Sequence, residues 1–189
     1  MEKKTCCFSG HRPKAFPWRY NEKDPQCVWL KGRIAKEIER AVCDGFTRFI
    51  VGGAMGVDMW SAEAVIEYKK KHKRDDIELV LAIPFLDYAV HFTEDDKNRL
   101  MKIIDASSER VLTSPEDDTS RVTLKYYKRN EYMVDNSQRL IAVYEPRAGM
   151  RGGTKYTVEY AEKKGAEVVV IPWRTEYEAE MREKHNKKV

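Results

Sequence analysis

The chain has 189 residues, of which 42% are hydrophobic, 11% aromatic and 35% charged, with a formal net charge of +4 at pH 7. This length fits one domain with one core, and the aromatic content excludes an intrinsically disordered chain. The small excess of basic residues does not indicate a dedicated nucleic-acid binder. No apolar stretch approaches the ~20 residues of a membrane helix, and MEKKTCCFSGHRP turns polar too early for a signal peptide.

The first quarter of the chain predicts a strand, a loop and a helix. A short apolar run at 5–8 predicts a strand, which ends at the breaker SGHRP. Residues 13–27 contain three prolines and predict a long loop. From 28 to 42 apolar residues recur every fourth position, which predicts a helix that ends at Gly45.

The alternation continues to the end of the chain. Strands are expected at 46–51, 78–83, 110–113, 140–144 and 167–171, and helices at about 57–71, 93–104, 122–137 and 154–164. The cationic run KKKHKR at 69–74 suits a solvated helix end better than a nucleic-acid patch, because positive side chains are favourable there. We expect residues 1–173 to form one domain and 174–189 a charged tail, folded as an exposed helix.

Strands that alternate with helices predict βαβ crossovers and a parallel sheet. Runs such as LVLAI are apolar throughout, as strands covered on both faces are. The predicted fold class is therefore α/β, a Rossmann-like three-layer sandwich with a mainly parallel sheet.

Cysteine and histidine positions argue against a metal site. The sequence has four cysteines and no C-x-x-C pair: Cys6, Cys7, Cys27 and Cys43. Cys6 and Cys7 should point to opposite faces of a strand, so they are poorly placed to bind one metal ion. The four histidines are far apart in the sequence. We therefore expect reduced thiols, no metal and a cytosolic location.

Three polar or glycine-rich turns each follow a predicted strand: SGHRP at 9–13, GGAMGVD at 52–58 and RAGMRGGT at 147–154. The carboxyl ends of parallel strands share one edge of the sheet, where ligands bind. Glycine lets backbone N–H groups approach an anion closely, and the first turn of the next helix adds unpaired N–H donors. The three turns together predict one cleft for a phosphate-bearing ligand.

Individual residues of these turns allow two interpretations. Gly152, Gly153 and Thr154 predict a phosphate site, or a tight turn with Thr154 as the helix N-cap. Asp58 could bind ribose hydroxyls, or it could cap its helix. Arg12 could pair with a phosphate, or it could lie in solvent.

Some motifs are missing and one residue is ambiguous. His11 has no identifiable carboxylate partner, and a lone histidine is more often structural than a catalytic base. The sequence lacks the G-x-G-x-x-G fingerprint after the first strand, the P-loop motif, the G-x-S-x-G elbow and the H-E-x-x-H motif. Dinucleotide dehydrogenases, P-loop NTPases, α/β-hydrolases and zincin proteases are therefore set aside.

Five segments carry a family resemblance: SGHRP at 9–13, GGAMGVD at 52–58, RNEYMVDNS at 129–137, LIAVYEP at 140–146 and GGTKYTVEYA at 152–161. In this order they resemble the YpsA/YoqJ-type family of the SLOG superfamily, to which DprA-like and LOG proteins also belong. The resemblance covers about residues 5–172. It implies a Rossmann-like fold, a mononucleotide or ADP-ribose-like ligand, and an association with bacterial cell division and stress physiology. It implies no certain cofactor and no settled enzymatic activity.

The strand ends and the resemblance together predict a set of ligand-binding residues. These are Ser9, Gly10, His11 and Arg12; Gly52, Gly53, Ala54, Gly56 and Asp58; Arg129 and Asn130; and Gly152, Gly153, Thr154 and Thr157. For Arg129 the alternative is a solvated helix arginine.

One departure from the LOG pattern bears on activity. The LOG motif is roughly P-G-G-x-G-T-x-x-E, and its final glutamate assists cleavage of the N-glycosidic bond. When Thr157 is matched to the motif threonine, Tyr160 stands at the position of that glutamate, and Glu159 lies one residue early, about 100° around a helix. A sensor or regulatory protein is therefore expected rather than a LOG-type hydrolase, and enzymatic activity is left open.

The resemblance to DprA gives an alternative, binding of single-stranded DNA. Four aromatic residues could stack on bases: Trp18, Tyr20, Tyr126 and Tyr127. The low net charge and the lack of a basic stripe argue against it. A protein-interaction module that senses a metabolite is a third class, and protein partners or a homo-oligomer remain open.

Overall fold

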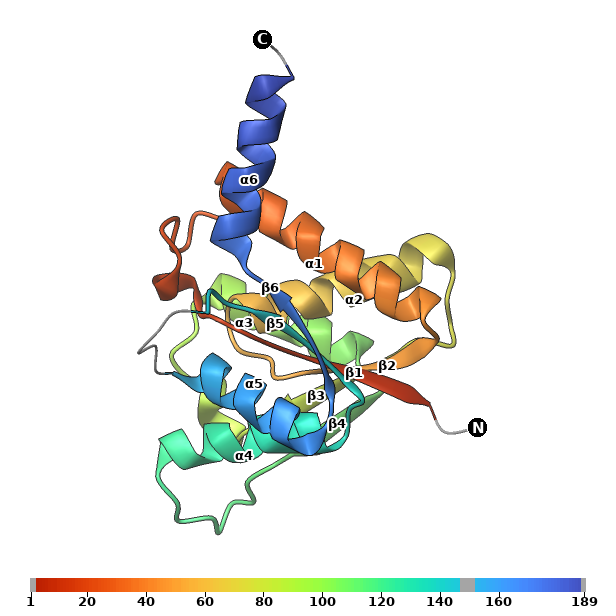
Figure 1. Cartoon of the computed structure of the whole chain (residues 1–189). Helices are drawn as coiled ribbons and strands as arrows, with labels where there is room; N and C mark the ends of the chain where they lie inside the picture. The colour runs from red at the N-terminus through yellow and green to blue at the C-terminus, as the bar shows by residue number, and fades with distance from the viewer. Residues whose placement is uncertain (1–2, 147–151, 188–189) are drawn as a thin grey trace.

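A computed structural model describes residues 3–146 and 152–187. Within them, one parallel sheet has the strand order β4-β3-β2-β1-β5-β6 (Figure 1). The strands are β1 (Lys4–Gly10), β2 (Phe46–Val51), β3 (Glu78–Ile83), β4 (Glu109–Leu112), β5 (Arg139–Val143) and β6 (Glu167–Ile171). From β1 to β4 the chain moves outward in one direction, and it then returns to place β5 on the other side of β1. This reversal creates a topological switch point between β1 and β5.

Helices cover both faces of the sheet, as Figure 1 shows. They are α1 (Pro25–Cys43), α2 (Val57–His72), α3 (Glu94–Ala106), α4 (Val122–Asp135), α5 (Gly153–Lys164) and α6 (Trp173–Asn186), with 3-10 turns η1 (Pro13–Ala15) and η2 (Leu86–Ala89). The core under α1, α2 and α3 includes Cys6, whereas the core under α4 and α5 includes Cys7. The two neighbouring cysteines therefore face opposite sides of β1, and the predicted three-layer α/β sandwich is confirmed.

The loop predicted at 13–27 is present but ends at Asp24 and contains the 3-10 turn η1. Helix α1 begins at Pro25, because proline suits the first helical position and the Asp24 side chain accepts a hydrogen bond from the Gln26 N–H at 2.8 Å. Phe16 and Trp18 are buried in the core under α1 and α2. The segment is therefore an ordered part of the core and not only a surface connection.

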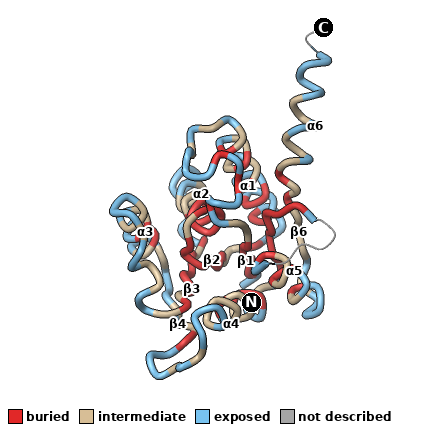
Figure 2. Tube along the Cα trace, turned by 90° about the vertical axis from the view of Figure 1, so that its left-hand side faces the viewer, coloured by how far each residue is buried: buried red, intermediate tan, exposed pale blue. Residues whose placement is uncertain are grey.

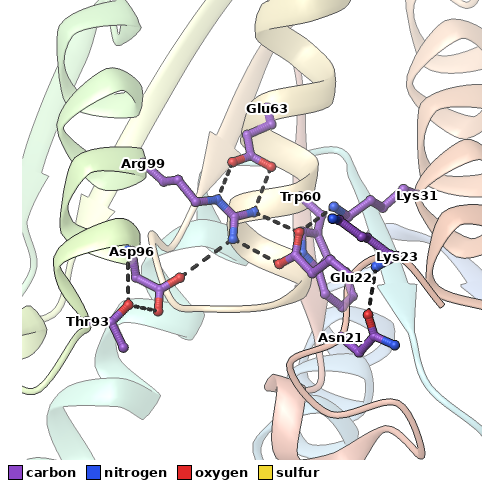
Figure 3. A network of polar contacts seen from close by, with 9 residues as sticks. All are labelled: Asn21, Glu22, Lys23, Lys31, Trp60, Glu63, Thr93, Asp96 and Arg99. Carbon is purple, nitrogen blue, oxygen red and sulfur yellow. Dashed lines mark hydrogen bonds and ion pairs between the residues drawn. The ribbon is translucent and has the colours of Figure 1, made fainter.

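A polar network fixes this segment against two helices (Figure 3). Arg99 of α3 donates to Glu63 of α2 at 2.7 and 2.9 Å and to Glu22 at 2.9 and 3.3 Å. Glu22 also accepts the indole N–H of Trp60 at 2.8 Å and pairs with Lys31 of α1. Burial alone would raise the pKa of Glu22, but the bonds from Lys31, Trp60 and Arg99 outweigh it and lower that pKa.

The predicted tail is helical, but it is not exposed along its whole length. Trp173 is buried at the start of α6. Further along, Arg33 of α1 donates to Glu176 and Trp29 donates to Glu180, both at 2.7 Å. The inner part of α6 therefore docks on α1, while its outer end is exposed (Figure 2). The part of the chain that the structure describes contains no helix long and apolar enough to cross a membrane.

Candidate functional site

A cavity of about 320 Å³ opens at the carboxyl ends of the strands, beside the switch point between β1 and β5. It is lined by the end of β1 and by residues of α2, α4 and α5 and their turns. The predicted site residues that line it are Ser9, Gly10, His11, Arg12, Ala54, Asp58, Arg129, Asn130, Gly153 and Thr154. The predicted residues Gly52, Gly53, Gly56, Gly152 and Thr157 do not line it. The segments predicted to form one cleft therefore do come together. Not every predicted residue in these segments lines the cavity.

The floor of the cavity contains a buried ion pair. Arg129 Nη1 donates to Asp58 Oδ2 at 3.0 Å, and the two residues are only 6% and 8% exposed. The same Asp58 oxygen accepts the backbone N–H of Ala54 at 3.2 Å. The solvated alternative for Arg129 is therefore wrong. The capping alternative for Asp58 is also wrong, because Gly56 is the N-cap of α2 and no side chain caps that helix.

Two glycines of the β2–α2 turn make room for this pair. A Cβ atom on Gly52 would lie 1.3 Å from Arg129 Nη1, so only glycine fits there. Gly53 has a φ of +67°, and a Cβ there would lie 2.7 Å from the Tyr88 hydroxyl oxygen. Burial raises the pKa of Tyr88 and keeps this phenol neutral. Both glycines therefore make room for packed side chains, and neither lines the cavity.

The first turn of α2 is closed by its own surroundings. The Val57 N–H donates to the His11 carbonyl at 3.4 Å, and the Met59 N–H donates to the Ala54 carbonyl at 3.2 Å. Asp58 places a carboxylate in that turn. An anion is therefore disfavoured at the N-terminus of α2.

The first turn of α5 differs, because no side chain of the described residues caps it. Its N-cap is Gly152, with a φ of +145° and no side-chain cap, and the first turn has no acidic residue. Thr154 lies inside the helix and is buried, so its predicted alternative role as N-cap is wrong. The first N–H groups of a helix lack intrahelical partners, and two residues of this first turn, Gly153 and Thr154, line the cavity. Of the predicted turn RAGMRGGT, residues 147–151 lie outside the described residues.

Thr157 acts through its neighbours. Its hydroxyl donates to the Gly153 carbonyl at 2.7 Å and accepts the side-chain N–H of Asn130 at 2.9 Å. The threonine therefore holds the Asn130 amide beside the start of α5.

Arg12 supplies an accessible cation at the cavity. It is exposed, and its guanidinium carbon lies 4.9 Å from the centre of the Tyr126 ring. None of the ion pairs among the described residues involves it. Burial lowers the pKa of the adjacent His11, so this imidazole is neutral at pH 7. Arg12 is thus better suited than His11 to pair with an anion.

The sequence predictions named only part of the cavity wall, and Thr123, Phe8 and Met55 were missed. Thr123, Tyr126, Tyr127 and Asn130 line the cavity together from α4. Their spacing of three, four and seven residues is that of one helix face. Applied to the helix predicted at 122–137, this spacing could have identified Thr123. It could also have placed the two tyrosines on the same helix face as Asn130. Phe8 and Met55 line the cavity too, and no sequence signal distinguishes them from core residues.

Four residues considered for base stacking or for glycosidic cleavage lie away from the cavity. Trp18 is buried and stacks on Phe16 at 4.7 Å, so its predicted stacking on bases is wrong. Tyr20 is exposed but lies at another hollow. Glu159 pairs with Lys155 at 3.3 Å and is largely exposed, and Tyr160 donates to Asp135 at 3.1 Å. Neither Glu159 nor Tyr160 lines the cavity.

The described residues contain no group of three or more His, Cys, Asp or Glu side chains arranged to hold a metal ion.

Known proteins are similar to this chain in sequence and in fold. Residues 6–174 match the sequence model of the YpsA family, described as "YspA SLOG family". The chain is 31% identical over 151 residues to the uncharacterized SPbeta prophage-derived protein YoqJ of Bacillus subtilis, a match that covers 75% of this chain and 85% of YoqJ. It is 27% identical over 168 residues to a UPF0398 protein of Bacillus cereus, covering 86% and 84% of the two chains.

A solved structure is similar in fold. DNA processing protein A from Helicobacter pylori, described for its single-stranded DNA binding mode, superposes with a TM-score of 0.56 at 17% identity. The match covers 89% of this chain and 65% of that protein, so the chain spans less than two thirds of its length. At this identity the similarity concerns the fold alone.

Proposed function

The chain belongs to the YpsA family of SLOG proteins, and we propose that it binds a phosphate-bearing nucleotide-type ligand, a mononucleotide or an ADP-ribose-like molecule, in the cavity beside β1 and β5. The observation that carries this proposal is the first turn of α5, which has no acidic residue and no cap from a described side chain and lies at a cavity that also holds the exposed Arg12. Helix N-termini of this kind are ready anion sites. The first turn of α2 is less favourable for an anion, which supports a phosphate position at α5 rather than at α2.

The test uses the purified full chain with the four ribonucleoside 5′-monophosphates and ADP-ribose, followed by thermal shift and titration calorimetry. Gly153→Asp puts a negative charge at the first turn of α5 and should abolish the stabilisation. Gly32→Asp is the matched control, because Gly32 is on α1 with no atom within 4 Å of its Cβ position. Equal nucleotide binding by a folded Gly153→Asp variant would place the phosphate elsewhere.

We propose a sensor or regulatory role rather than LOG-type hydrolysis. The support is the position of Glu159, whose carboxylate is exposed and paired with Lys155 away from the cavity. Chromatography of nucleoside monophosphates incubated with the protein should show no free base. Turnover that Glu159→Gln abolishes would contradict this. A cytosolic location and a role in cell division or stress physiology remain part of the proposal.

Single-stranded DNA is the second candidate ligand. It is favoured by Tyr126 and Tyr127, which line the cavity beside Arg12, since aromatic and cationic groups together bind single strands. Fluorescence anisotropy with a labelled oligothymidylate tests it. Tight, salt-dependent binding that nucleotides do not displace would favour DNA over the nucleotide.

A further inference from the structure

The Asp58–Arg129 pair has unused hydrogen-bonding capacity. Asp58 Oδ2 already accepts from the Ala54 N–H and from Arg129 Nη1. Asp58 Oδ1 accepts no hydrogen bond from any residue that the structure describes. Arg129 Nε is buried and has no partner within the same residues. A carboxylate offers about four lone-pair sites and a guanidinium five N–H donors, so the pair, whose two residues line the cavity, keeps acceptor and donor capacity that no described residue uses.

A charge-neutral pair of this kind selects the group that it can hold. A phosphate would be attracted by the guanidinium of Arg129 but repelled by the carboxylate of Asp58, and an ammonium would meet the reverse. A hydroxyl both donates and accepts, so it can bond to both members of the pair. Two adjacent hydroxyls match the pair best. Because the pair is more than nine-tenths buried, leaving its polar atoms unmatched in a filled cavity would be costly.

The position of the pair within the cavity fits a sugar. On α4, the Asn130 amide nitrogen lies 4.0 Å from the Cβ position of Gly153, whereas Arg129 faces the β2–α2 turn. One helical turn earlier, Tyr126 lies near both arginines, with Arg129 at 5.9 Å and Arg12 at 4.9 Å from its ring centre. A phosphate at α5 and a base at Tyr126 would leave the sugar between them to face the pair.

We propose that the ligand is a ribonucleotide, held through its ribose 2′- and 3′-hydroxyls by the Asp58–Arg129 pair, and that deoxynucleotides are discriminated against. The inference rests on the proposed function, since it assumes a nucleotide in this cavity. A ribose held in this way would favour a ribonucleotide over DNA at this site, because DNA lacks the 2′-hydroxyl.

Titration calorimetry of the full chain with ribonucleoside 5′-monophosphates and their 2′,3′-dideoxy counterparts tests the proposal. Loss of hydrogen bonds to a charged pair should weaken binding about 10- to 100-fold. A ratio below about fivefold overturns the inference, whereas a larger one supports it. If no nucleotide binds, the proposed function itself fails. If ribo and dideoxy forms bind equally while the four bases differ widely, the pair contacts the base and only this inference fails.

A variant of Asp58 tests whether the preference for ribonucleotides comes from the Asp58–Arg129 pair. Asp58→Asn removes the charge at nearly constant size, and the ribo-to-dideoxy ratio should fall toward one. Asp95→Asn is the matched control, because Asp95 is exposed in the first turn of α3 and does not line the cavity. A folded Asp58→Asn protein that keeps the wild-type ratio overturns the role of Asp58. If this variant does not fold, the wild-type ratio alone decides.

Discussion

The β2–α2 turn and the β5–α5 turn follow parallel strands at the same edge of the sheet, and both are rich in glycine. In the first, Gly52 admits the Arg129 side chain, and Asp58 places a paired carboxylate in the N-terminal turn of the helix. In the second, no described side chain caps the helix and its first turn has no acidic residue. A glycine-rich turn can therefore serve either internal packing or an external anion, and the carboxylate in the first helical turn distinguishes the two.

The largest effect should come from Gly52→Ala. Its new Cβ would lie 1.3 Å from Arg129 Nη1 and would force the buried pair apart. Breaking a buried pair costs about 3–5 kcal/mol, and the free energy of unfolding measured in urea should fall by that amount. Gly32→Ala is the control, because an open helical glycine replaced by alanine should gain about 0.5–1 kcal/mol. A Gly52→Ala protein as stable as wild type would contradict this, and would show that Arg129 can move away from the β2–α2 turn at little cost in stability.

Arg129→Met should have the next largest effect. It leaves Asp58 buried with one donor, the Ala54 N–H, and should cost about 3 kcal/mol. A double-mutant cycle with Asp58→Asn measures the coupling between the two residues. If the losses of stability in the two single variants simply add up in the double variant, Asp58 and Arg129 do not stabilise each other. Their ion pair would then not hold the β2–α2 turn in place.

The network in Figure 3 supports α2 from its other side, and its contribution should be smaller. Arg99→Met should lower stability at pH 7 by about 1 kcal/mol, since the pairs are partly exposed. The folded pKa of Glu22 is lowered. Its stabilisation is therefore present above the unfolded pKa of about 4.3 and is lost as pH falls through the folded value. The difference between wild type and Glu22→Gln should accordingly shrink in acid denaturation curves, and a constant difference would contradict the network.

The smallest change in stability, with the opposite sign, should come from Gly153→Asp. A carboxylate near a helix N-terminus stabilises by about 0.3–1 kcal/mol, so thermal unfolding of the ligand-free variant should move slightly upward while nucleotide binding is lost. Raised stability together with unchanged nucleotide binding would show that the β5–α5 turn lacks a cap but does not bind the phosphate.

The elements of the fold could be predicted because strand and helix periodicities are local. The start of α1 at Pro25 was missed because three prolines outweighed the local Asp24 cap. The partners Asp58 and Arg129 are 71 residues apart, so no local pattern links them, although each was a candidate alone. Trp18 was a candidate for base stacking in a proline-rich loop, whereas its burial and its contact with Trp173, 4.9 Å between ring centres, place it in the core. Long-range packing therefore decides which candidate residues face a ligand.

The aromatic cluster under α1 and α6 has an optical consequence. Trp18, Trp60 and Trp173 surround Phe16 on the side of the sheet away from α4, and Trp29 packs on Tyr177 of α6. The four tryptophans of the chain therefore lie outside the cavity wall, which contains tyrosines. Intrinsic tryptophan emission should report undocking of α6 and the 13–24 segment, while a ligand entering the cavity should change chiefly the tyrosine bands of the near-ultraviolet circular dichroism. The two signals would separate, in one sample, an event at the C-terminal helix from one at the switch point.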